Sequence, residues 1–403
     1  MRVEQLSFQG VRNLAPTELS FNPHANVIFG ENGAGKTSLL ECLAIICTGK
    51  TFRPGRSGAV LGDNEDMLRV IGRVADGSLT RRVGVERYRN GDILAKLDGE
   101  KVTSASFLTK EFPVIIIDDR VFNTMEGGPQ MRRNLLNWAM FHVKHSCFVH
   151  FKQYRRLRKH RAALLKQQKV DIDALRALDR ALCPVAASLA AAAGELVSEV
   201  SMSAGSEDLT SEELSDKCGA DGKGVKSVTA ANSTSAVIHY QSGYGQVVDR
   251  LIALREDRTD VGNAIAESLR ESEQSDIAAG FSQRGLSRSD ITFKVNGKRA
   301  DQRLSRGQKK RLTTDFILSL LNLFVQKSSK KPLVLMDDIA AELDHLHLEN
   351  LLQAFSRLEV QCFYTVVARD IAEIPLPFNT LEPVSMFHVK HGKAILYNKD
   401  VDL

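Results

Sequence analysis

Eight consecutive residues near the start of the chain have the types and spacing of a phosphate-binding loop. The run Gly30-Glu31-Asn32-Gly33-Ala34-Gly35-Lys36-Thr37 fits G-x-x-x-x-G-K-[ST] and has apolar residues on both sides. Glycines let backbone N–H groups turn towards phosphate oxygens, and the start of a following helix favours the same anion. The predicted ATP-binding residues are Gly30, Glu31, Asn32, Gly33, Ala34, Gly35, Lys36, Thr37 and Ser38. A glycine-rich turn with a chance lysine is the alternative, and the flanking strand and helix argue against it.

Two carboxylates near residue 337 complete the chemistry that such a loop needs. Lys36 is expected to contact the β- and γ-phosphates, and the Thr37 hydroxyl is a ligand type for Mg²⁺. A buried strand at 333–336 ends in Asp337-Asp338. We predict that Asp337 joins Thr37 at Mg²⁺, which prefers carboxylate oxygens beside nucleotide oxygens. Asp338 is predicted to be catalytic, by orienting or deprotonating the attacking water.

A third motif precedes the acidic strand. Leu304-Ser305-Arg306-Gly307-Gln308 resembles the L-S-x-G-Q signature of ABC-type ATPases, and the stretch 341–344 resembles their D-loop. In that class the signature of one subunit covers the nucleotide held by another. The resemblance implies a catalytic role for Ser305, nucleotide contacts from Gly307 and Gln308, and an ATP-dependent homodimer. A capped helix start explains the motif in isolation, but the three motifs occur in the order that the class requires.

The elements that position these motifs follow from the residue pattern. Strands are expected at 26–29, 114–117, 291–295, 333–336 and 362–367, and a helix after the loop. Residues 68–102 predict a strand meander with turns at Asp76-Gly77, Asn90-Gly91 and Asp98-Gly99. Helical patterns fill 132–199 and 245–279. The predicted fold class is therefore α/β, an ABC-type P-loop ATPase head with a helical insertion lobe.

Size and composition predict a protein of two lobes, and we expect it to be cytoplasmic. The chain has 403 residues, 43% hydrophobic, with a net charge of +5. The N-terminus does not resemble a signal peptide, and no stretch is expected to be apolar and long enough to span a membrane. The six cysteines form no Cys-x-x-Cys pair, and a repeated Met-Phe-His-Val-Lys-His does not predict a zinc site. We assign 1–119 with 295–403 to the ATPase lobe and 120–294 to a helical arm, with a flexible loop near 204–235.

Local sequence within this class is similar to that of the RecF family of SMC-like ATPases. The opening run Phe8–Leu14 resembles that of the family, and Thr51-Phe52-Arg53 follows the loop helix as it does there. Asp337-Asp338 stands where most ABC proteins have Asp-Glu, and the RecF family also has Asp-Asp at this point. The chain departs from the family at 285–288, where Gly-Leu-Ser-Arg replaces Gly-Pro-His-Arg, and neither a Q-loop glutamine nor a switch residue is assigned.

The resemblance implies a function in the DNA-damage (SOS) response. Members of the family are weak ATPases of recombinational repair and replication-fork recovery. They bind duplex DNA near single-strand gaps as an ATP-induced dimer, and they act with RecR and RecO to assist loading of RecA. Two alternatives stay open. One is the cytosolic ATPase subunit of an ABC transporter, against which the long insertion between Lys36 and Ser305 argues. The other is a structural SMC-like clamp, which needs heptad arms that the chain lacks.

A basic segment is the candidate DNA surface. Residues 141–170 contain no Asp or Glu, and their apolar residues keep helical spacing, so one face can pack while the rest is cationic. We predict that Arg155, Arg158 and Lys159 contact DNA phosphates. A solvated helix face, or a docking face for a protein, is the alternative.

Overall fold

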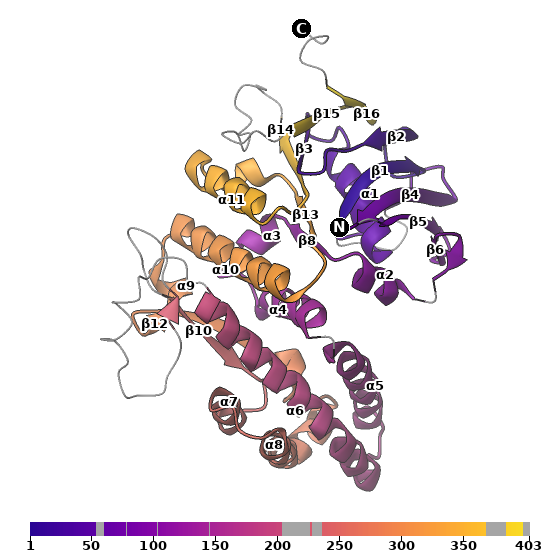
Figure 1. Cartoon of the computed structure of the whole chain (residues 1–403). Helices are drawn as coiled ribbons and strands as arrows, with labels where there is room; N and C mark the ends of the chain where they lie inside the picture. The colour runs from indigo at the N-terminus through magenta and orange to yellow at the C-terminus, as the bar shows by residue number, and fades with distance from the viewer. Residues whose placement is uncertain are drawn as a thin grey trace. The chain divides into compact units, whose positions relative to one another are not determined.

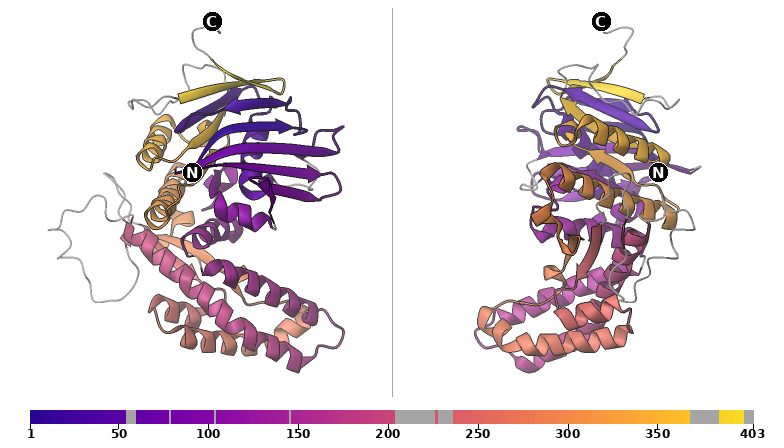
Figure 2. Two further views of the ribbon diagram at one scale, coloured as in Figure 1. Left: turned by 45° about the vertical axis from the view of Figure 1, so that its right-hand side comes forward. Right: turned by 90° about the vertical axis from the view of Figure 1, so that its left-hand side faces the viewer.

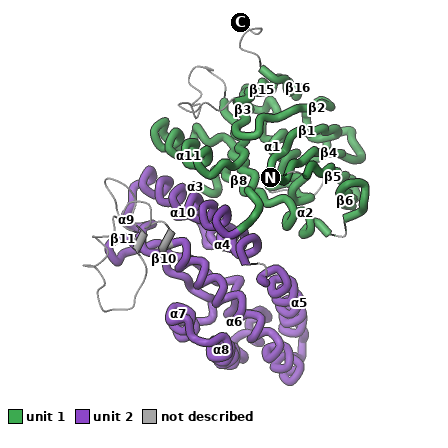
Figure 3. Tube along the Cα trace, viewed as in Figure 1, with its two compact units in different colours: residues 1–122, 328–403 green, residues 123–327 purple. Residues whose placement is uncertain are grey.

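The chain folds into two compact units. The structure is a computed structural model that describes residues 1–53, 60–77, 79–102, 104–144, 146–203, 226–227, 236–367 and 384–397. Unit 1 comprises Met1–Phe122 and Ser328–Leu403, and unit 2 comprises Asn123–Lys327 (Figure 3). The first boundary lies close to the predicted residue 119. The second lies well beyond the predicted residue 294, so Ser305 and the helix after it belong to the helical unit.

Unit 1 holds two sheets and the loop helix (Figure 1). Its strands and helices are β1 (Arg2–Gln9), β2 (Thr17–Ser20), β3 (Ala25–Gly30), α1 (Lys36–Thr48), β4 (Met67–Asp76), β5 (Leu79–Tyr88), β6 (Ile93–Leu97), β7 (Glu100–Lys101), α2 (Ala105–Glu111), β8 (Val114–Ile117), α3 (Asp119–Phe122), β13 (Leu333–Met336), η3 (Ile339–Ala341), α11 (His345–Arg357), β14 (Cys362–Val367), β15 (Val384–Lys390) and β16 (Lys393–Leu396).

The first sheet of unit 1 is antiparallel, in the order β2-β1-β4-β5-β6-β7. The three predicted turns fall between β4 and β5, between β5 and β6, and between β6 and β7, so the meander is confirmed. Two-residue Asp-Gly turns suit such hairpins because they supply positive φ; Asp98 and Gly99 have φ of 51° and 90°.

The second sheet runs in the order β16-β15-β3-β14-β13-β8. Strands β15, β3, β14, β13 and β8 are parallel, and β16 joins the edge antiparallel. Because all five parallel strands point the same way, the ends of β3, β13 and β14 lie at one edge of the sheet. The predicted phosphate loop follows β3 and the predicted carboxylates follow β13, so the topology brings both motifs to that edge.

Helix α1 lies between the two sheets (Figure 2). From Ser38 to Cys47 every one of its side chains is buried, and it contacts strands of both sheets. A helix that is apolar nearly all round must be covered on all sides, which explains why its sequence lacks a polar stripe. Gly72 on β4 accommodates this packing, because a Cβ there would lie 2.7 Å from Ile46 Cδ1.

Unit 2 is mainly helical and carries a small antiparallel sheet in the order β12-β11-β10-β9. Its elements are α4 (Pro129–Val143), α5 (Cys147–Leu165), α6 (Ile172–Ser203), β9 (Lys226–Ser227), β10 (Ala236–Gln241), α7 (Gln246–Ala253), α8 (Arg258–Ala279), η2 (Leu286–Arg288), β11 (Asp290–Val295), β12 (Lys298–Arg299), α9 (Ala300–Arg303) and α10 (Arg306–Lys327).

Helix α10 belongs to this unit because it packs against α4 and α6, and this packing moves the second boundary to Lys327. Most of the predicted flexible loop near 204–235 lies outside the described residues, which include only β9 of that stretch. Strand β10 follows directly and was not predicted. Its pairing with β11 over six residues fixes it as a strand.

Helix α6 corrects the expectation that no stretch could span a membrane. Residues Ile172–Val200 are long and apolar enough by composition, with a mean hydropathy of 1.5 over 18 residues. The Ala-rich run around Ala186 to Ala193 produces this value. The helix packs against α5, α8, α10 and β10, and its Ala186, Ala187 and Ala190 are fully buried. Its hydrophobicity is therefore that of the core helix of unit 2.

A buried arginine joins three segments of unit 2. Arg161 on α5 is only 2% exposed. Its guanidinium donates to Asp179 on α6 at 2.7 Å, to Asp276 on α8 at 2.8 Å and to the Ser282 hydroxyl at 2.6 Å. Asp276 is itself 0% exposed, so this carboxylate depends on Arg161 for its counter-charge.

Replacing Arg161 with methionine is therefore expected to destabilise the protein strongly. Arg161→Met keeps the apolar stem but leaves buried Asp276 without its cation, which should lower the free energy of unfolding by about 3 to 5 kcal/mol. Urea unfolding followed by circular dichroism measures the loss. The matched control is Arg176→Met, which breaks the exposed pair with Glu273 and should cost far less stability. Equal losses in the two variants would contradict a structural role for Arg161.

Candidate functional site

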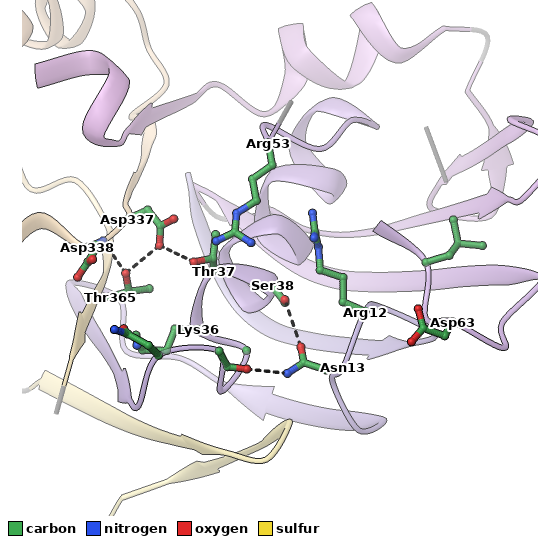
Figure 4. Close-up of a pocket in the computed structure, with 14 residues that line it drawn as sticks. Arg12, Asn13, Lys36, Thr37, Ser38, Arg53, Asp63, Asp337, Asp338 and Thr365 are labelled. Carbon is green, nitrogen blue, oxygen red and sulfur yellow. Dashed lines mark hydrogen bonds between the residues drawn. The ribbon is translucent and has the colours of Figure 1, made fainter. Parts of the chain in front are cut away.

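A pocket of about 560 Å³ lies in unit 1 where the phosphate loop leaves β3 (Figure 4). Its lining combines residues from the predicted loop, from the ends of β13 and β14, and from loops near residues 12, 53 and 63. The lining residues are Arg12, Asn13, Asn32, Gly33, Gly35, Lys36, Thr37, Ser38, Arg53, Leu61, Asp63, Asp337, Asp338 and Thr365. The structure thus places both predicted carboxylates beside most of the predicted loop; Gly30, Glu31 and Ala34 are in the loop but do not line the pocket.

Neighbouring backbone and side chains fix the conformation of the loop. Gly35 has a φ of 117°, a region that favours glycine, and a Cβ there would lie 2.8 Å from Leu14 Cδ2. The Asn13 amide donates to the Gly33 carbonyl at 3.0 Å, and the Gly392 N–H donates to the Ala34 carbonyl at 3.1 Å. The loop therefore keeps its shape through contacts with the chain after β1 and with the β15–β16 turn.

The Lys36 ammonium lies inside the loop. It donates to the carbonyl oxygens of Gly30 at 2.8 Å and Glu31 at 3.0 Å, and the residue is 7% exposed. Burial lowers the pKa of Lys36, and the nearby charges of Asp338 and Asp337 oppose that shift. A cation held at this point between loop and carboxylates can bind an anion that enters the pocket.

A network of two hydroxyls holds Asp337. The Thr37 and Thr365 hydroxyls each donate to Asp337 Oδ1 at 2.9 Å. Burial raises the pKa of Asp337; the hydrogen bonds from Thr365 and Thr37 and the charge of Arg53 lower it, and Asp338 raises it further. The carboxylate is thus partly desolvated, and additional positive charge beside it would stabilise its ionised form.

The oxygens at this point fit a hard divalent cation. Thr37 supplies a hydroxyl and Asp337 a carboxylate, both oxygen ligands of the kind that Mg²⁺ binds. Nitrogen and sulfur ligands do not line the pocket apart from the cationic groups of Lys36, Arg12 and Arg53 and the amide groups of Asn13 and Asn32. In the described part of the chain, no group of three or more His, Cys, Asp or Glu side chains could hold a metal by itself. A metal held by Thr37 and Asp337 would therefore complete its coordination with water or with a bound ligand.

Asp338 adopts an unusual backbone conformation at the mouth of the pocket. Its φ is 53°, which is uncommon for a residue with a side chain, and its N–H donates to the Thr365 hydroxyl at 2.7 Å. The side chain is exposed. Such conformations persist where surrounding contacts impose them, and here the Thr365 hydroxyl bridges Asp338 N–H and the Asp337 carboxylate.

Sequence reasoning missed six of the residues that line the pocket: Arg12, Asn13, Arg53, Leu61, Asp63 and Thr365. Arg12 and Arg53 stood in runs that resemble the RecF family, but no role at the nucleotide was assigned to them. Thr365 could have been suggested by its place near the end of the predicted strand 362–367, because that strand ends at the same edge as 333–336. Asp63 gave no signal, since it lies in a loop without a recognisable pattern.

The signature residues form a capped helix start in unit 2. The Ser305 N–H donates to Gln308 Oε1 at 2.9 Å, and the Gln308 N–H donates to the Ser305 hydroxyl at 3.3 Å. This reciprocal pair is a capping box at the start of α10. Ser305, Gly307 and Gln308 are all exposed, and they are not among the residues that line the pocket.

Helix α5 carries the predicted DNA-binding residues. Arg155, Arg158 and Lys159 are exposed, whereas Arg161 is buried in its ion-pair cluster. Lys144, also in the acid-free span, pairs with Glu195 at 2.9 Å on α6. Some basic residues of the span 141–170 are therefore used in ion pairs within unit 2 and do not contribute to an exposed cationic face. The three predicted DNA-binding residues do contribute to it.

The chain is similar to known proteins over nearly its whole length. The family described as "RecF/RecN/SMC N terminal domain" matches residues 2–374. The protein named DNA replication and repair protein RecF in Chromohalobacter salexigens is 30% identical over 98% of this chain and 99% of its own length. The protein of the same name in Stutzerimonas stutzeri is 30% identical over 98% of this chain and 97% of its own.

Solved structures show the same fold. The structure titled "recombination mediator protein RecF-ATPrS in RecFOR pathway" has a TM-score of 0.80 at 20% identity and covers 98% of both chains. The corresponding RecF-ATP structure has a TM-score of 0.79 at 22% identity, over 98% of this chain and 99% of that chain. The observed α/β head with a helical insertion is thus the architecture of those proteins, and the matches over the sequence place this chain in the RecF family.

Proposed function

We propose that this chain is an ATP-binding protein of DNA replication and repair, which hydrolyses ATP slowly and binds duplex DNA near single-strand gaps. Its relatives are named DNA replication and repair protein RecF, and one structure of the same fold is titled RecF-ATP. One observation carries the proposal: the hydrogen bond from Thr37 to Asp337 joins residues 300 apart in sequence at the end of the phosphate loop. The family match over residues 2–374, insertion included, leaves the transporter alternative without support.

Four pocket residues have proposed parts in ATP binding and hydrolysis. The N–H groups of the loop and the start of α1 bind the phosphates, and Lys36 exchanges its contacts with Gly30 and Glu31 for phosphate oxygens. Thr37 and Asp337 are the ligands for Mg²⁺, which when bound neutralises phosphate charge. The elevated pKa of Asp337 supports this role, because a dication offsets the cost of ionising a desolvated carboxylate. Asp338 is exposed at the mouth, where it accepts a proton from the attacking water.

Two substitutions should separate binding from hydrolysis. Lys36→Ala is expected to lose tight ATP binding, because it removes the cation that faces the phosphates. Asp338→Asn should bind Mg-ATP normally but hydrolyse it about a hundredfold more slowly, because an amide cannot accept the proton. Nucleotide affinity by calorimetry and phosphate release measure the two effects. Asp66→Asn, an exposed carboxylate that does not line the pocket, is the control. Normal turnover by Asp338→Asn would remove Asp338 from catalysis.

The exposed capping box at Ser305 supports an ATP-induced homodimer. A helix start attracts an anion, and Gly307 leaves room for close approach, since nothing lies within 4 Å of a Cβ built there. In the proposed dimer, Ser305, Gly307 and Gln308 of each chain contact the nucleotide bound by the other. The assembly is two-fold and holds two nucleotides.

Ser305→Arg tests that dimer. The bulky side chain stands where the γ-phosphate is expected, so the variant should bind ATP as a monomer and fail to dimerise. Analytical ultracentrifugation with and without ATP measures the change in mass. Ser287→Arg, at another exposed serine of unit 2, should dimerise normally. An ATP-induced dimer of Ser305→Arg at wild-type concentrations would rule out the arrangement.

The cationic face of α5 is the proposed DNA surface. Reversing Arg155, Arg158 and Lys159 to glutamate removes three cations and adds three anions. Phosphate contacts carry affinity but little sequence information, so binding should weaken about equally on all duplexes. The slope of log affinity against log salt should fall by about one for each DNA phosphate that the variant no longer neutralises. Fluorescence anisotropy at several salt concentrations measures both quantities.

A second triple reversal controls for net charge alone. Arg180, Arg250 and Arg258 are exposed on other helices of unit 2, and their reversal changes the total charge equally. This control should keep nearly all of its DNA affinity. The proposal fails if both triple variants lose the same DNA affinity, or if the α5 variant loses none. In either case α5 is a solvated face or a docking face for a protein. The proposed partners RecR and RecO, which act with this protein to assist RecA, are then candidates for α5.

A further inference from the structure

We propose that Glu41 is a positioning residue that fixes two arginines on the walls of the nucleotide pocket, Arg12 and Arg53. The inference rests on the proposed function, because it takes the pocket to be a nucleotide site. Glu41 lies in α1, is 0% exposed, and is flanked by the buried Leu40 and Cys42. No part of the proposed ATP chemistry uses this carboxylate, although it is buried in the core between the two sheets.

The first contact of Glu41 is with Arg12. Arg12 Nε lies 2.7 Å from Glu41 Oε2, and Arg12 Nη2 donates to Glu41 Oε1 at 3.1 Å. The second contact is a hydrogen bond and the first is a close approach of opposite charges, so both carboxylate oxygens of Glu41 hold the guanidinium. Arg12 has a φ of 43°, an uncommon backbone conformation for a residue with a side chain. The pair thus holds a lining residue of the pocket whose backbone is also constrained.

The second contact leads to Arg53. The Thr51 hydroxyl donates to Glu41 Oε1, and Arg53 follows two residues later. The intervening residue is also held, because Arg120 Nη2 donates to the Phe52 carbonyl at 3.1 Å. Asp118, which is buried, in turn orients Arg120 through its carboxylate. Two consecutive residues are therefore fixed immediately before Arg53 enters the pocket.

The two arginines lie in different parts of the pocket (Figure 4). Arg53 lies above Thr37, on the side of Asp337 and Asp338, and its charge lowers the pKa of Asp337. Arg12 lies on the far side of Thr37 from those carboxylates, beside Asp63. Because Thr37 and Asp337 mark the metal and γ-phosphate end, Arg53 serves that end and Arg12 the remainder of the nucleotide.

Packing alone does not explain a carboxylate at residue 41. A buried ion pair is often no more stabilising than apolar side chains of similar volume, and the surrounding helix is apolar. What a carboxylate adds is directional hydrogen bonding to two separate segments. Burial lowers the pKa of Arg87, which is 5% exposed, and the nearby charge of Glu41 opposes that shift. This further cation offsets part of the cost of burying the Glu41 charge.

Glu41→Gln removes the charge and keeps the shape. The variant should bind ADP about tenfold more weakly, the change expected when a site is deprived of one charge-assisted hydrogen bond, and ATP more weakly still, because the Arg53 side is disturbed as well. Cys42→Ala, an equally buried change in the same helix, measures any general effect of loosening α1. Calorimetric titration with each nucleotide provides the affinities. Equal affinities in Glu41→Gln and Cys42→Ala would overturn the proposal.

A double-mutant cycle separates positioning from general destabilisation. If Glu41 acts through Arg12, then Glu41→Gln should weaken ADP binding much less in an Arg12→Ala background than in the wild type. Fully additive losses would overturn the role. Wild-type protein that binds no ATP would instead refute the proposed function, so the two failures are distinguishable.

Thr51→Val provides a test that does not need Glu41 to be changed. This variant breaks only the contact on the Arg53 side, so ATP affinity should fall while ADP affinity stays close to that of the wild type. Arg12→Ala should weaken both nucleotides about equally. An unchanged preference for ATP over ADP in Thr51→Val would overturn the assignment even if Glu41→Gln failed to fold.

Discussion

The hydrogen bond between Thr37 and Asp337 is the contact on which unit 1 depends for its chemistry. It joins the first turn of α1 to the end of β13, and Thr365 at the end of β14 donates to the same carboxylate oxygen. Three segments that are far apart in sequence are thereby held at one edge of the parallel sheet. Burial raises the pKa of Asp337 there, and the hydrogen bonds from Thr365 and Thr37 oppose that shift. The hydroxyls of Thr37 and Thr365 and the charge of Arg53 lower the cost of burying this carboxylate. The same carboxylate can bind a cation.

The placement of α1 between two sheets explains the distribution of polar residues around the pocket. Such a helix has no solvated face, so each polar side chain on it needs a partner. Lys36 has carbonyl oxygens of the loop, Ser38 lies next to Asn13 at 3.5 Å, and Glu41 has Arg12 and Thr51. All of these partners lie on segments that border the pocket. Apart from Thr48 in the last turn, whose hydroxyl donates to the Ala44 carbonyl, the polar residues of this apolar helix thus form the site or orient its walls.

Arginines on the single helix α5 of unit 2 are either buried in ion pairs or exposed to solvent. Arg161 of α5 is buried among Asp179, Asp276 and Ser282 and joins helices, while Arg155 and Arg158 are exposed. The difference follows from helical position: Tyr154, Arg161 and Leu165 share the packed face, and the remaining cations point away from it. The same principle governs α6, whose apolar length reflects burial among α5, α8, α10 and β10.

The sequence by itself determined the local elements of this protein and the chemistry of its loop. Strands 114–117, 333–336 and 362–367 were located to the residue, and so were the turns of the meander, because each depends on short-range hydrophobic pattern and turn residues. The phosphate loop and the two carboxylates were identified from residue type and spacing. The loop and the carboxylates lie close together because the parallel strands that precede them end at the same edge of the sheet.

Only the tertiary structure decided which other residues join them. Thr365, Arg12, Arg53 and Asp63 reach the pocket through the order of strands in the sheet and through loop packing, which no local pattern encodes. Strand β10 was missed because it follows a polar stretch and is defined by pairing with β11. The boundary at Lys327 depends on packing of α10 against α4 and α6. Hydrophobic periodicity specifies which side of an element is buried, but the partner that buries it is set by contacts between segments distant in sequence.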